Sequence, residues 1–597
     1  MLQGAQRLVF TCLLLVAVVH SARAASGALQ LPYHPSDHSL SAQTILLTGQ
    51  DLTVEQVVAV ARHGARIALS DKARQRSADA YGLLLEATAE GVPVYWFNRG
   101  SGAGREVAIF NGDALSPENK AMLEARQLEI FRRGATAGVG PEILDEDIVR
   151  AMLVVRANTM TYEAASPSLT QALLDIINAG ITPVVRSRST VGEGDLGPFT
   201  NVCATLVGAG DAYYHGVRMS AEKALKSTGL KPLAPFAADD SALISTNSYA
   251  SAQAALLVFD ARQALGWADL AYGIDLNGMN SSVTPLSAPV QENRPFPWLN
   301  WHAARMLSMI KGSYLYYDDP TRIIQDAESL RASSIRQASA WQAWDRLRST
   351  VQLQINSSDH NPAVRVGAAP TDSWELNTPQ LLKFYVRGGP HSNGKHGYIL
   401  SNANWDPYPL VNDIEAFTIA LANMDVAIGQ RIGRFTSPFF TGISAAAEKV
   451  GEPGRWGASQ GSALAASALM QEIQGLAVPV PPEGTALILN VEDLQSQSRL
   501  KVSRARLAVS NTEDLIAEDL LTGTYWLDLR RLQTPERMFG IAVTGVWKGL
   551  RTVVPFDDGD VLSQTESIHD RAVGFIRAHE PTSFYPDSDS APMPSVH

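Results

Sequence analysis

Two glycine-rich segments of the 597-residue chain carry the residue types and spacing that could do chemistry. Residues 95–104 end in a Gly-x-Gly-x-Gly pattern, and residues 189–198 contain Gly192, Glu193 and Gly194 in succession. As phosphate-binding loops they are weak, because the first segment lacks a following Lys-Ser/Thr pair and an acidic ribose partner in register. Glycines so placed more often mark crowded backbone or a positive φ. Both segments are therefore predicted to be specialised loops rather than nucleotide sites.

Helices are predicted for most of the chain around these loops. One is bounded by Ser-Pro at residues 116–117 and by Gly134, and another by Ser-Pro at residues 166–167 and by Gly180. Residues 414–428 alternate three- and four-residue apolar spacings, as in a helical bundle. Further proline-poor stretches, several of them long enough to exceed about 30 Å as helices, are residues 245–275, 318–356, 411–435, 455–477, 494–522 and 534–551; the second and the last contain one proline each, Pro320 and Pro535, near their starts. We therefore predict a mainly α fold.

The composition indicates a folded protein that does not bind nucleic acid. Hydrophobic residues make up 45% of the chain and charged residues 18%, as in globular rather than disordered proteins. The formal charge of −11 disfavours a polyanionic partner. Cys12 and Cys203 are the only cysteines, which excludes a disulfide framework. Beyond the N-terminus no run of about 18 apolar residues occurs, so no membrane span is predicted.

Residues 1–24 are predicted to be a secretory signal peptide. Arg7 precedes an apolar run over residues 8–19, and Ala-Arg-Ala at residues 22–24 gives the small-x-small cleavage pattern. The run is too short for a bilayer, which needs about 20 residues, and a buried N-terminal helix is the alternative. Cleavage would leave Cys203 as the one thiol of an exported protein, which would be periplasmic in a Gram-negative source.

Six ordered landmarks resemble motifs of the aromatic amino acid ammonia-lyase and aminomutase superfamily, which includes histidine and phenylalanine ammonia-lyases. They are residues 95–102 (Tyr-Gly-Ile-Asn-Thr-Gly-Phe-Gly in the family), 137–140 (Ala-Gly-Val-Gly), 194–198 (Gly-Asp-Leu-x-Pro), 325–331 (Gln-Asp-x-Tyr-Ser-Leu-Arg), 358–362 (Ser-Asp-Asn-Pro, with one residue inserted here) and 490–493 (Asn-Gln-Glu-Asp). The resemblance implies a mainly α-helical, ammonia-lyase-like protomer with a central long-helix bundle. It also implies a homotetramer whose active sites combine loops from three subunits.

The landmarks suggest a division of the chain into consecutive parts. We expect a signal peptide (1–24), an N-terminal arm (25–50), an active-site-loop domain (51–240), a central helical bundle (241–478), a C-terminal helical part (479–575) and a flexible tail (576–597). Residues 363–400 resemble an insertion relative to the bacterial histidine lyases, and their role is left open. Glycine-rich insertions beside a pocket are often lids or contacts between subunits.

The resemblance breaks down where the family makes its electrophile. Members convert an Ala-Ser-Gly tripeptide into methylideneimidazolone, and the serine loses its hydroxyl as water to leave a methylene group. Here the corresponding residues are Gly192, Glu193 and Gly194. Glu193 has no β-hydroxyl to eliminate, so methylideneimidazolone is not expected to form and no other cofactor is predicted. Family deamination by that route is therefore not expected.

Other pocket positions of the family are carried over residue by residue. Tyr95 aligns with the catalytic tyrosine that removes the β-proton, Arg331 with the arginine that clamps the substrate carboxylate, and Glu492 with the glutamate near the substrate amine. Glu328 stands in place of the second motif tyrosine. Further candidates for substrate binding are Trp405, Ser245 and, two residues on, Asn247 as a substitute for the family asparagine.

Glu193, Glu328 and Glu492 are expected to place three carboxylates around one cavity with Arg331. Crowded carboxylates cannot all ionise cheaply, so at least one pKa should rise towards working pH. Beside Tyr95, such a carboxyl group makes a plausible acid–base pair for moving a proton at carbon. It could also favour a cationic amine or a divalent metal, but no histidine joins the aligned pocket and a metal site is not predicted.

Two classes of function stay open. The first is an exported enzyme that performs elimination, addition or isomerisation on a carboxylate-bearing, amino acid-like substrate without methylideneimidazolone. The second is a binding or scaffold protein that kept the fold and lost the chemistry. A plain scaffold has no need of a tyrosine base, an arginine and a glutamate together, which favours the enzyme. The sequence does not specify the substrate, the direction of reaction or whether an amine leaves.

Overall fold

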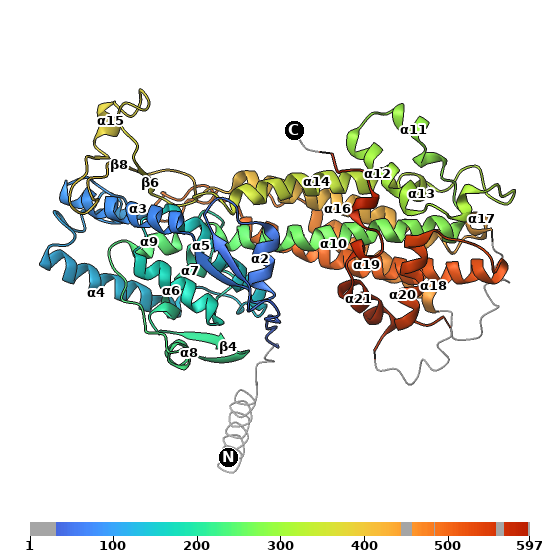
Figure 1. The fold of residues 1–597 in the computed structure, drawn as a ribbon, viewed down its shortest axis with the longest axis horizontal. Coiled ribbons are helices and arrows are strands. Elements are labelled where there is room, and N and C mark those ends of the chain that lie inside the picture. Colours follow the sequence, from blue (N-terminus) through green and yellow to red (C-terminus); the bar gives the residue numbers. More distant parts are fainter. Residues whose placement is uncertain (1–31, 443–456, 483, 557–565, 595–597) are drawn as a thin grey trace, which may run out of the picture.

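Five long helices form the central bundle of the computed structural model, which describes residues 32–442, 457–482, 484–556 and 566–594 (Figure 1). They are α10 (Ser248–Met279), α14 (Ser333–Gln354), α16 (Tyr408–Arg434), α18 (Gly457–Ala477) and α19 (Ser498–Gln533). In α16 the predicted seam of Ile414, Phe417, Leu421, Met424 and Ile428 is fully buried. The apolar spacing read from the sequence therefore produces a packed bundle, and the predicted mainly α fold is confirmed.

A mixed lobe forms from the N-terminal half of the chain and carries the ends of the bundle helices. Its helices are α2 (Val54–Ala61), α3 (Asp71–Ala89), α4 (Pro117–Arg133), α5 (Glu146–Thr159), α6 (Pro167–Asn178), α7 (Leu196–Leu206), α8 (Ala221–Thr228) and α9 (Asp239–Ile244). Two small sheets complete it: parallel β1 (Thr44–Leu47) and β2 (Arg66–Leu69), and antiparallel β3 (Ile181–Pro183), β4 (Asp211–Tyr214) and β5 (Val217–Ser220). The Ser166 side chain caps α6, as its Ser-Pro start predicts.

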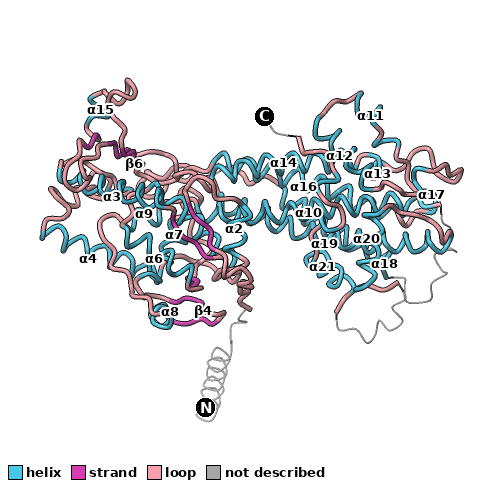
Figure 2. The backbone as a smooth tube through the Cα atoms, in the orientation of Figure 1, coloured by secondary structure: helices cyan, strands magenta, loops and turns pink. Residues whose placement is uncertain are grey.

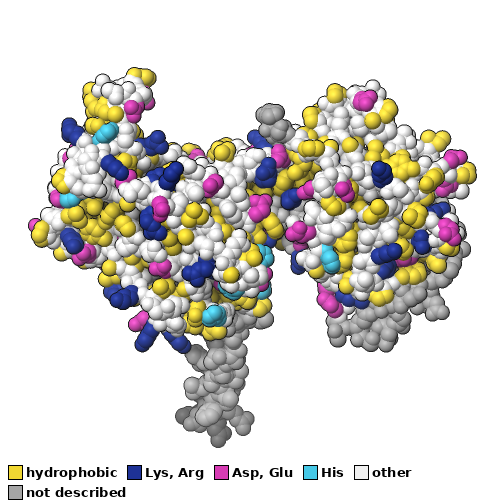
Figure 3. Space-filling view, in the orientation of Figure 1, with side chains coloured by type: hydrophobic (Ala, Val, Ile, Leu, Met, Phe, Trp, Pro, Cys, Tyr) yellow, Lys and Arg dark blue, Asp and Glu magenta, His cyan; other side chains and the backbone are white. Residues whose placement is uncertain are grey.

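The insertion forms a small sheet of its own. Strands β6 (Ala363–Val366), β8 (Gly397–Leu400) and β7 (Tyr385–Val386) are antiparallel in that order, with α15 (Pro379–Leu382) beside them. It projects from the lobe near α3 (Figures 1 and 2). Hydrophobic side chains gather on this projection (Figure 3), and Trp374 is 83% exposed.

Short helices cover the other end of the bundle. They are α11 (Ala288–Glu292), α12 (Pro297–Met309), α13 (Glu328–Arg331), α17 (Pro438–Thr441), α20 (Ile541–Val553) and α21 (Ile568–Ala578). In Figure 1 this end lies at the opposite side of the molecule from the mixed lobe. Glu328 and Arg331 are therefore held far from the two glycine-rich loops of the same chain.

The C-terminal residues differ from the predicted flexible tail. Ala591 accepts a hydrogen bond from Trp301 Nε1 at 2.9 Å, and Asp587 pairs with Arg262 at 2.6 Å. Tyr585 is 5% exposed, under the Arg305 guanidinium. Residues 585–591 are thus held by one buried aromatic side chain and by polar contacts, in a segment whose composition predicts a flexible tail.

Two further expectations concern the signal peptide and a membrane span. The predicted signal peptide, residues 1–24, lies outside them. Within the described part of the chain, no helix combines the length and apolar character that a membrane crossing requires.

Candidate active site

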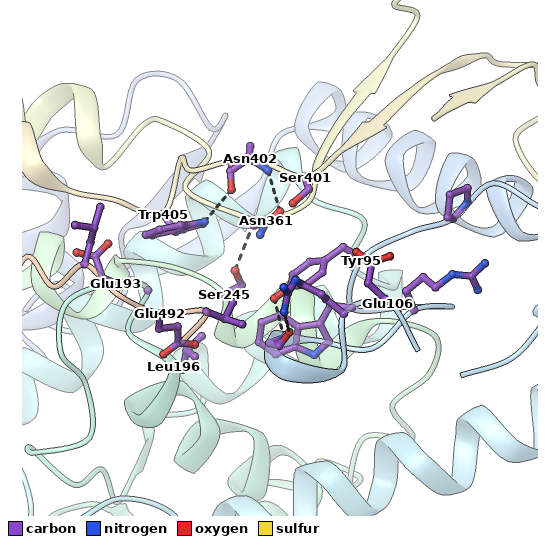
Figure 4. A pocket seen from close by; sticks show the side chains of 18 of the residues that line it. Tyr95, Glu106, Glu193, Leu196, Ser245, Asn361, Ser401, Asn402, Trp405 and Glu492 are labelled. Atoms are coloured by element: carbon purple, nitrogen blue, oxygen red, sulfur yellow. Dashed lines mark hydrogen bonds between the residues drawn. The ribbon is translucent and has the colours of Figure 1, made fainter. Parts of the chain in front are cut away.

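A cavity of about 460 Å³ lies where the ends of four bundle helices meet the two glycine-rich loops (Figure 4). Ser245 comes just before α10, Asn361 follows α14, Trp405 comes before α16 and Glu492 comes before α19. Each side chain is thus fixed by the end of a long, packed helix. The structure brings together six residues predicted from the sequence: Tyr95, Glu193, Gly194, Ser245, Trp405 and Glu492.

Glu328 and Arg331 do not line this cavity. Both lie in α13, which comes before the 22-residue α14, while Asn361 follows it; the helix alone separates the two ends by about 33 Å. The expected cluster of three carboxylates around one arginine is therefore wrong for a single chain, where two of the three carboxylates meet. The order of motifs along a chain does not show whether two motifs that form one site come from the same copy of the protein. Among the described residues, no three His, Cys, Asp or Glu side chains come close enough to share a metal ion.

Glu193 occupies the tripeptide position and faces the cavity (Figure 4). Its Oε2 is buried without a hydrogen-bond partner in the described structure. Burial raises the pKa of its carboxyl group to about 7, and the nearby charges of Asp406, Asp195 and Glu492 add to the rise. A carboxyl group with this pKa can give or take a proton near neutral pH.

Glu492 lies on the same side of the cavity as Glu193 (Figure 4). Burial raises the pKa of its carboxyl group as well. The expected crowding of carboxylates is thus present, although with two members from this chain. Two acidic groups on one wall make that wall suitable for a cationic group of a ligand.

Gly192 is crowded by the segment that leads into α19. Its φ is +100°, and a Cβ at this position would lie 2.7 Å from Ser498 N and 2.8 Å from Gln497 N, and also against Ser496 Oγ. The Ser496 hydroxyl donates to the Gly192 carbonyl at 2.8 Å. In this structure no space exists for the methyl group of the family's alanine. The residues present therefore do not fit the Ala-Ser-Gly precursor at two of its three positions.

Asn247 has a different role from the predicted one. Its side chain is fully buried; Oδ1 accepts from the Gly194 amide at 3.1 Å and Nδ2 donates to the Trp405 carbonyl. Because both polar ends are used by backbone, Asn247 positions two walls of the cavity and leaves no group for a substrate. Ser245, whose Oγ accepts from Asn361 N at 3.4 Å, does line the cavity.

Tyr95 stands on the other side of the cavity from Glu193 and Glu492 (Figure 4). Its hydroxyl oxygen accepts a hydrogen bond from the Gly102 amide at 3.2 Å. The first glycine-rich loop thus folds back on its own tyrosine. A proton donor and a proton acceptor can therefore approach a bound molecule from two sides.

A buried network of charges underlies the cavity. Arg156 pairs with Glu163 at 3.2 Å, Glu163 pairs with His360 at 2.9 Å, and Asp359 accepts from the Asn247 amide at 2.6 Å. His360 is the extra residue in the segment 358–362, which resembles the motif Ser-Asp-Asn-Pro. All these side chains are at most 4% exposed, so they fix the backbone of the site and do not reach a ligand.

Sequence reasoning missed several residues of the cavity wall. The insertion contributes Lys383 and Phe384, and the first loop contributes Arg99, Arg105 and Glu106. The only signal for them was position: the loop residues follow Tyr95 directly, and the insertion lies between two landmarks. No motif marks Lys383, because the family pattern has no counterpart for the insertion.

Comparison with known proteins agrees with this architecture. A model of the aromatic amino acid lyase family matches residues 52–552. Histidine ammonia-lyase 2 of Fusobacterium nucleatum is 26% identical over 525 residues, covering 87% of this chain and 94% of that protein. Histidine ammonia-lyase of Deinococcus radiodurans is 26% identical over 518 residues, covering 85% and 90% respectively.

Solved structures share the fold. Ergothionase of Treponema denticola, an ergothioneine-degrading enzyme, aligns with a TM-score of 0.76 at 23% identity, covering 90% of this chain and 99% of that one. Phenylalanine aminomutase of Pantoea agglomerans aligns with a TM-score of 0.75 at 18% identity, covering 92% and 100%. The shared architecture extends over the bundle and the lobe that together form the cavity.

Proposed function

The chain belongs to the aromatic amino acid lyase family, and we propose that it is an exported enzyme that works without methylideneimidazolone. It moves a proton at carbon in a carboxylate-bearing, amino acid-like substrate, by elimination, addition or isomerisation. One observation carries the proposal: the Glu193 carboxyl group, whose Oε2 has no hydrogen-bond partner in the described structure, faces the same cavity as Tyr95 at the cofactor position.

Tyr95 acts as the base. The Gly102 amide donates to its oxygen and holds it in place, and the phenolate takes the proton from the substrate carbon. Glu193, with a pKa of about 7, supplies a proton to the leaving group on the other side; afterwards water takes the proton from Tyr95 and a proton from water returns to Glu193, which restores both groups. In an addition reaction the same two groups act in the opposite order. Glu492 holds a cationic amine, and Trp405 covers the ligand.

The proposal includes the statement that methylideneimidazolone does not form in this chain. Glu193 has no hydroxyl to lose, and the Gly192 position has no space for a side chain. Intact mass spectrometry of the mature protein tests this, since cyclisation and dehydration would remove the mass of two waters. We expect the unmodified mass; a deficit of that size would overturn this part.

Glu328 and Arg331 reach the cavity only from another copy of the chain. Exposed apolar side chains gather at the end that carries α13 and support association there: Tyr317 (71% exposed), Ile324 (98%), Phe439 (71%) and Ile541 (88%). We therefore keep the homotetramer as part of the proposal, with Arg331 of a second copy binding the substrate carboxylate.

Export rests on the residue pattern of positions 1–24. Fractionation of the native host, with N-terminal sequencing of the mature protein, tests it. A first residue near position 25 in the exported fraction agrees with the proposal; an intact Met1 in the cytoplasmic fraction contradicts it.

A screen for deuterium exchange tests the function itself. The mature protein is incubated in D2O with free amino acids and α,β-unsaturated acids, and NMR follows the loss of C–H signals. Exchange at the α- or β-carbon identifies the substrate class before any product is known. The alternative is a catalytically inactive lyase-fold binding or scaffold protein, favoured by the loss of the electrophile. Ligand-induced thermal stabilisation without exchange would select it.

A further inference from the structure

Acidic and basic side chains of the cavity wall come mainly from different segments of the chain. The wall formed by residues 193–196 and 491–494 carries Glu193, Glu492 and Asp493 and no basic residue among its lining side chains. The wall formed by residues 93–106 and the insertion carries Arg99, Arg105 and Lys383, with Glu106 as its single acidic member. The cavity is thus dipolar across its width.

The three basic side chains have no acidic partner within 4 Å in the described part of the chain. Arg99 donates to the Asn98 carbonyl at 3.2 Å and Arg105 to the Gly102 carbonyl at 3.3 Å, both within the first loop. Lys383 Nζ lies 4.8 Å from the centre of the Phe384 ring. Each has donors to spare, which an anion in the cavity could take.

Lys383 is held in place by backbone on both sides. Phe384 N donates to Leu381 O at 2.9 Å, closing the end of α15, and Ile399 N in β8 donates to Phe384 O. The insertion itself is tied to α3: the Glu90 carboxylate accepts from the amides of Arg387 at 2.9 Å and Gly388 at 2.8 Å. Its position argues for a fixed part of the wall rather than a lid.

Four aromatic side chains, Tyr95, Trp96, Phe384 and Trp405, also line the cavity, and its volume suits a small molecule. A ligand that satisfies all three parts has an apolar or aromatic centre, a cation at one end and an anion at the other.

We infer that Lys383, with Arg99 and Arg105, forms an anion subsite within one chain, so that the substrate is a dipolar molecule bound lengthwise across the cavity. Its cationic group lies against Glu193 and Glu492, and a second anionic group, distinct from the carboxylate that Arg331 of a second copy binds, lies against Lys383. This subsite is separate from Arg331, which lies in α13. The inference deepens the proposed function and rests on its placement of the cationic group, but it needs no catalysis to be tested.

Calorimetric titration of the mature protein tests the subsite. The probes are 4-(aminomethyl)benzoate, with a cation and an anion at opposite ends of a ring, benzylamine and benzoate, which each lack one end, and unbranched ω-amino acids of increasing length. We expect the best dipolar probe to bind at least about tenfold more tightly than benzylamine. Lys383→Met should remove that advantage and leave benzylamine binding unchanged.

Matched variants control for net charge and folding. Arg387→Met removes one charge from the same insertion at a residue that does not line the cavity, and should bind all probes as the wild type does. Lys383→Arg should keep the dipolar preference. Lys383→Glu should reverse it, so that 1,4-bis(aminomethyl)benzene binds more tightly than 4-(aminomethyl)benzoate.

Three results would overturn the inference: dipolar probes that bind no better than benzylamine, Lys383→Met with wild-type affinities, or no binding by any probe. Failure of the proposed function is distinguishable from these. Lys383-dependent binding without deuterium exchange on any substrate would contradict the catalysis alone, whereas exchange unaffected by Lys383→Met would contradict the subsite alone.

Discussion

Glu193 links the chemistry of the site to the stability of the fold. Its carboxyl group ionises near its ordinary pKa of 4.5 in the unfolded chain and near 7 in the folded one. Ionisation of Glu193 therefore lowers the free energy of unfolding. This destabilisation is absent below about pH 4.5 and fully developed above pH 7. A group that destabilises the folded state near neutral pH is typical of a functional site.

Glu193→Gln is expected to stabilise the protein at pH 8 while abolishing turnover. The gain in the free energy of unfolding should be about 1–2 kcal/mol, reduced for the partial exposure of the side chain, and should vanish at pH 5. Urea unfolding at both pH values measures it. An equal effect at both pH values, or a loss at pH 8, would exclude the raised pKa.

Gly192→Ala is expected to lower the free energy of unfolding by at least about 2 kcal/mol. The new methyl group would meet two backbone nitrogens, and the φ of +100° is unfavourable for alanine. Gly433→Ala in α16 is the matched control, since nothing lies within 4 Å of its Cβ; it should stabilise by about 0.5–1 kcal/mol. Thermal unfolding compares the two. A harmless Gly192→Ala would show that the loop can take the family's precursor sequence.

Residues with a motif could be predicted, and residues without one could not. The family resemblance implied that Tyr95, Glu193, Trp405 and Glu492 share a pocket, and all four line one cavity in the structure. Asn247 was assigned to the substrate because its residue type matched, although both its amide groups are used by backbone. Hydrogen-bond partners distant in sequence are invisible without the fold.

Among the elements, helices with capping residues and apolar stripes were predictable. The Ser-Pro starts of α4 and α6 and the seam of α16 lie where the sequence places them. The sheet of the insertion and the docked C-terminal residues were not predicted. Their strands are two to four residues long, and the C-terminal segment is held by a few tertiary contacts rather than by a local pattern.

Helix α21 docks on α19 through an ionised histidine. Hydrogen bonds that the His569 ring donates to the carboxylates of Asp514 and Glu518 raise the pKa of His569 to about 10, with His569 Nδ1 2.6 Å from Glu518 Oε1. This contribution to stability is fully present below about pH 6.5 and is lost as the pH rises through 10.

His569→Gln should therefore lower the free energy of unfolding by about 1 kcal/mol at pH 6, after allowing for partial exposure, and by much less at pH 10. Denaturant unfolding at the two pH values provides the comparison. A penalty that is independent of pH would mean that packing, and not charge, holds α21.

At the scale of the whole molecule, the bundle determines which residues one chain can bring together. Tyr95 and Arg331 lie at opposite ends of helices too long to fold back. A single sequence contains both residues but does not show how copies associate. One chain brings together Glu193 and Glu492 of the predicted cluster, and Glu328 and Arg331 can join them only from a second copy.

Mixed oligomers test whether two copies complete one site. Tyr95→Phe and Arg331→Ala are each expected to be inactive in deuterium exchange as pure proteins. Co-expression should restore a fraction of the wild-type rate, because some sites then combine an intact Tyr95 from one copy with an intact Arg331 from another. Inactive mixtures that still assemble would show that the two residues do not share a site.

The most direct test of the central claim is deuterium exchange by four proteins side by side: wild type, Tyr95→Phe, Glu193→Gln and the surface control Arg387→Met. With the substrate identified by the screen, NMR in D2O gives the rate at the exchanging carbon. We expect wild-type rates for Arg387→Met, no exchange for Tyr95→Phe, and for Glu193→Gln exchange without product. Exchange that survives in Tyr95→Phe, or product formation that survives in Glu193→Gln, would contradict an enzyme built on these two residues.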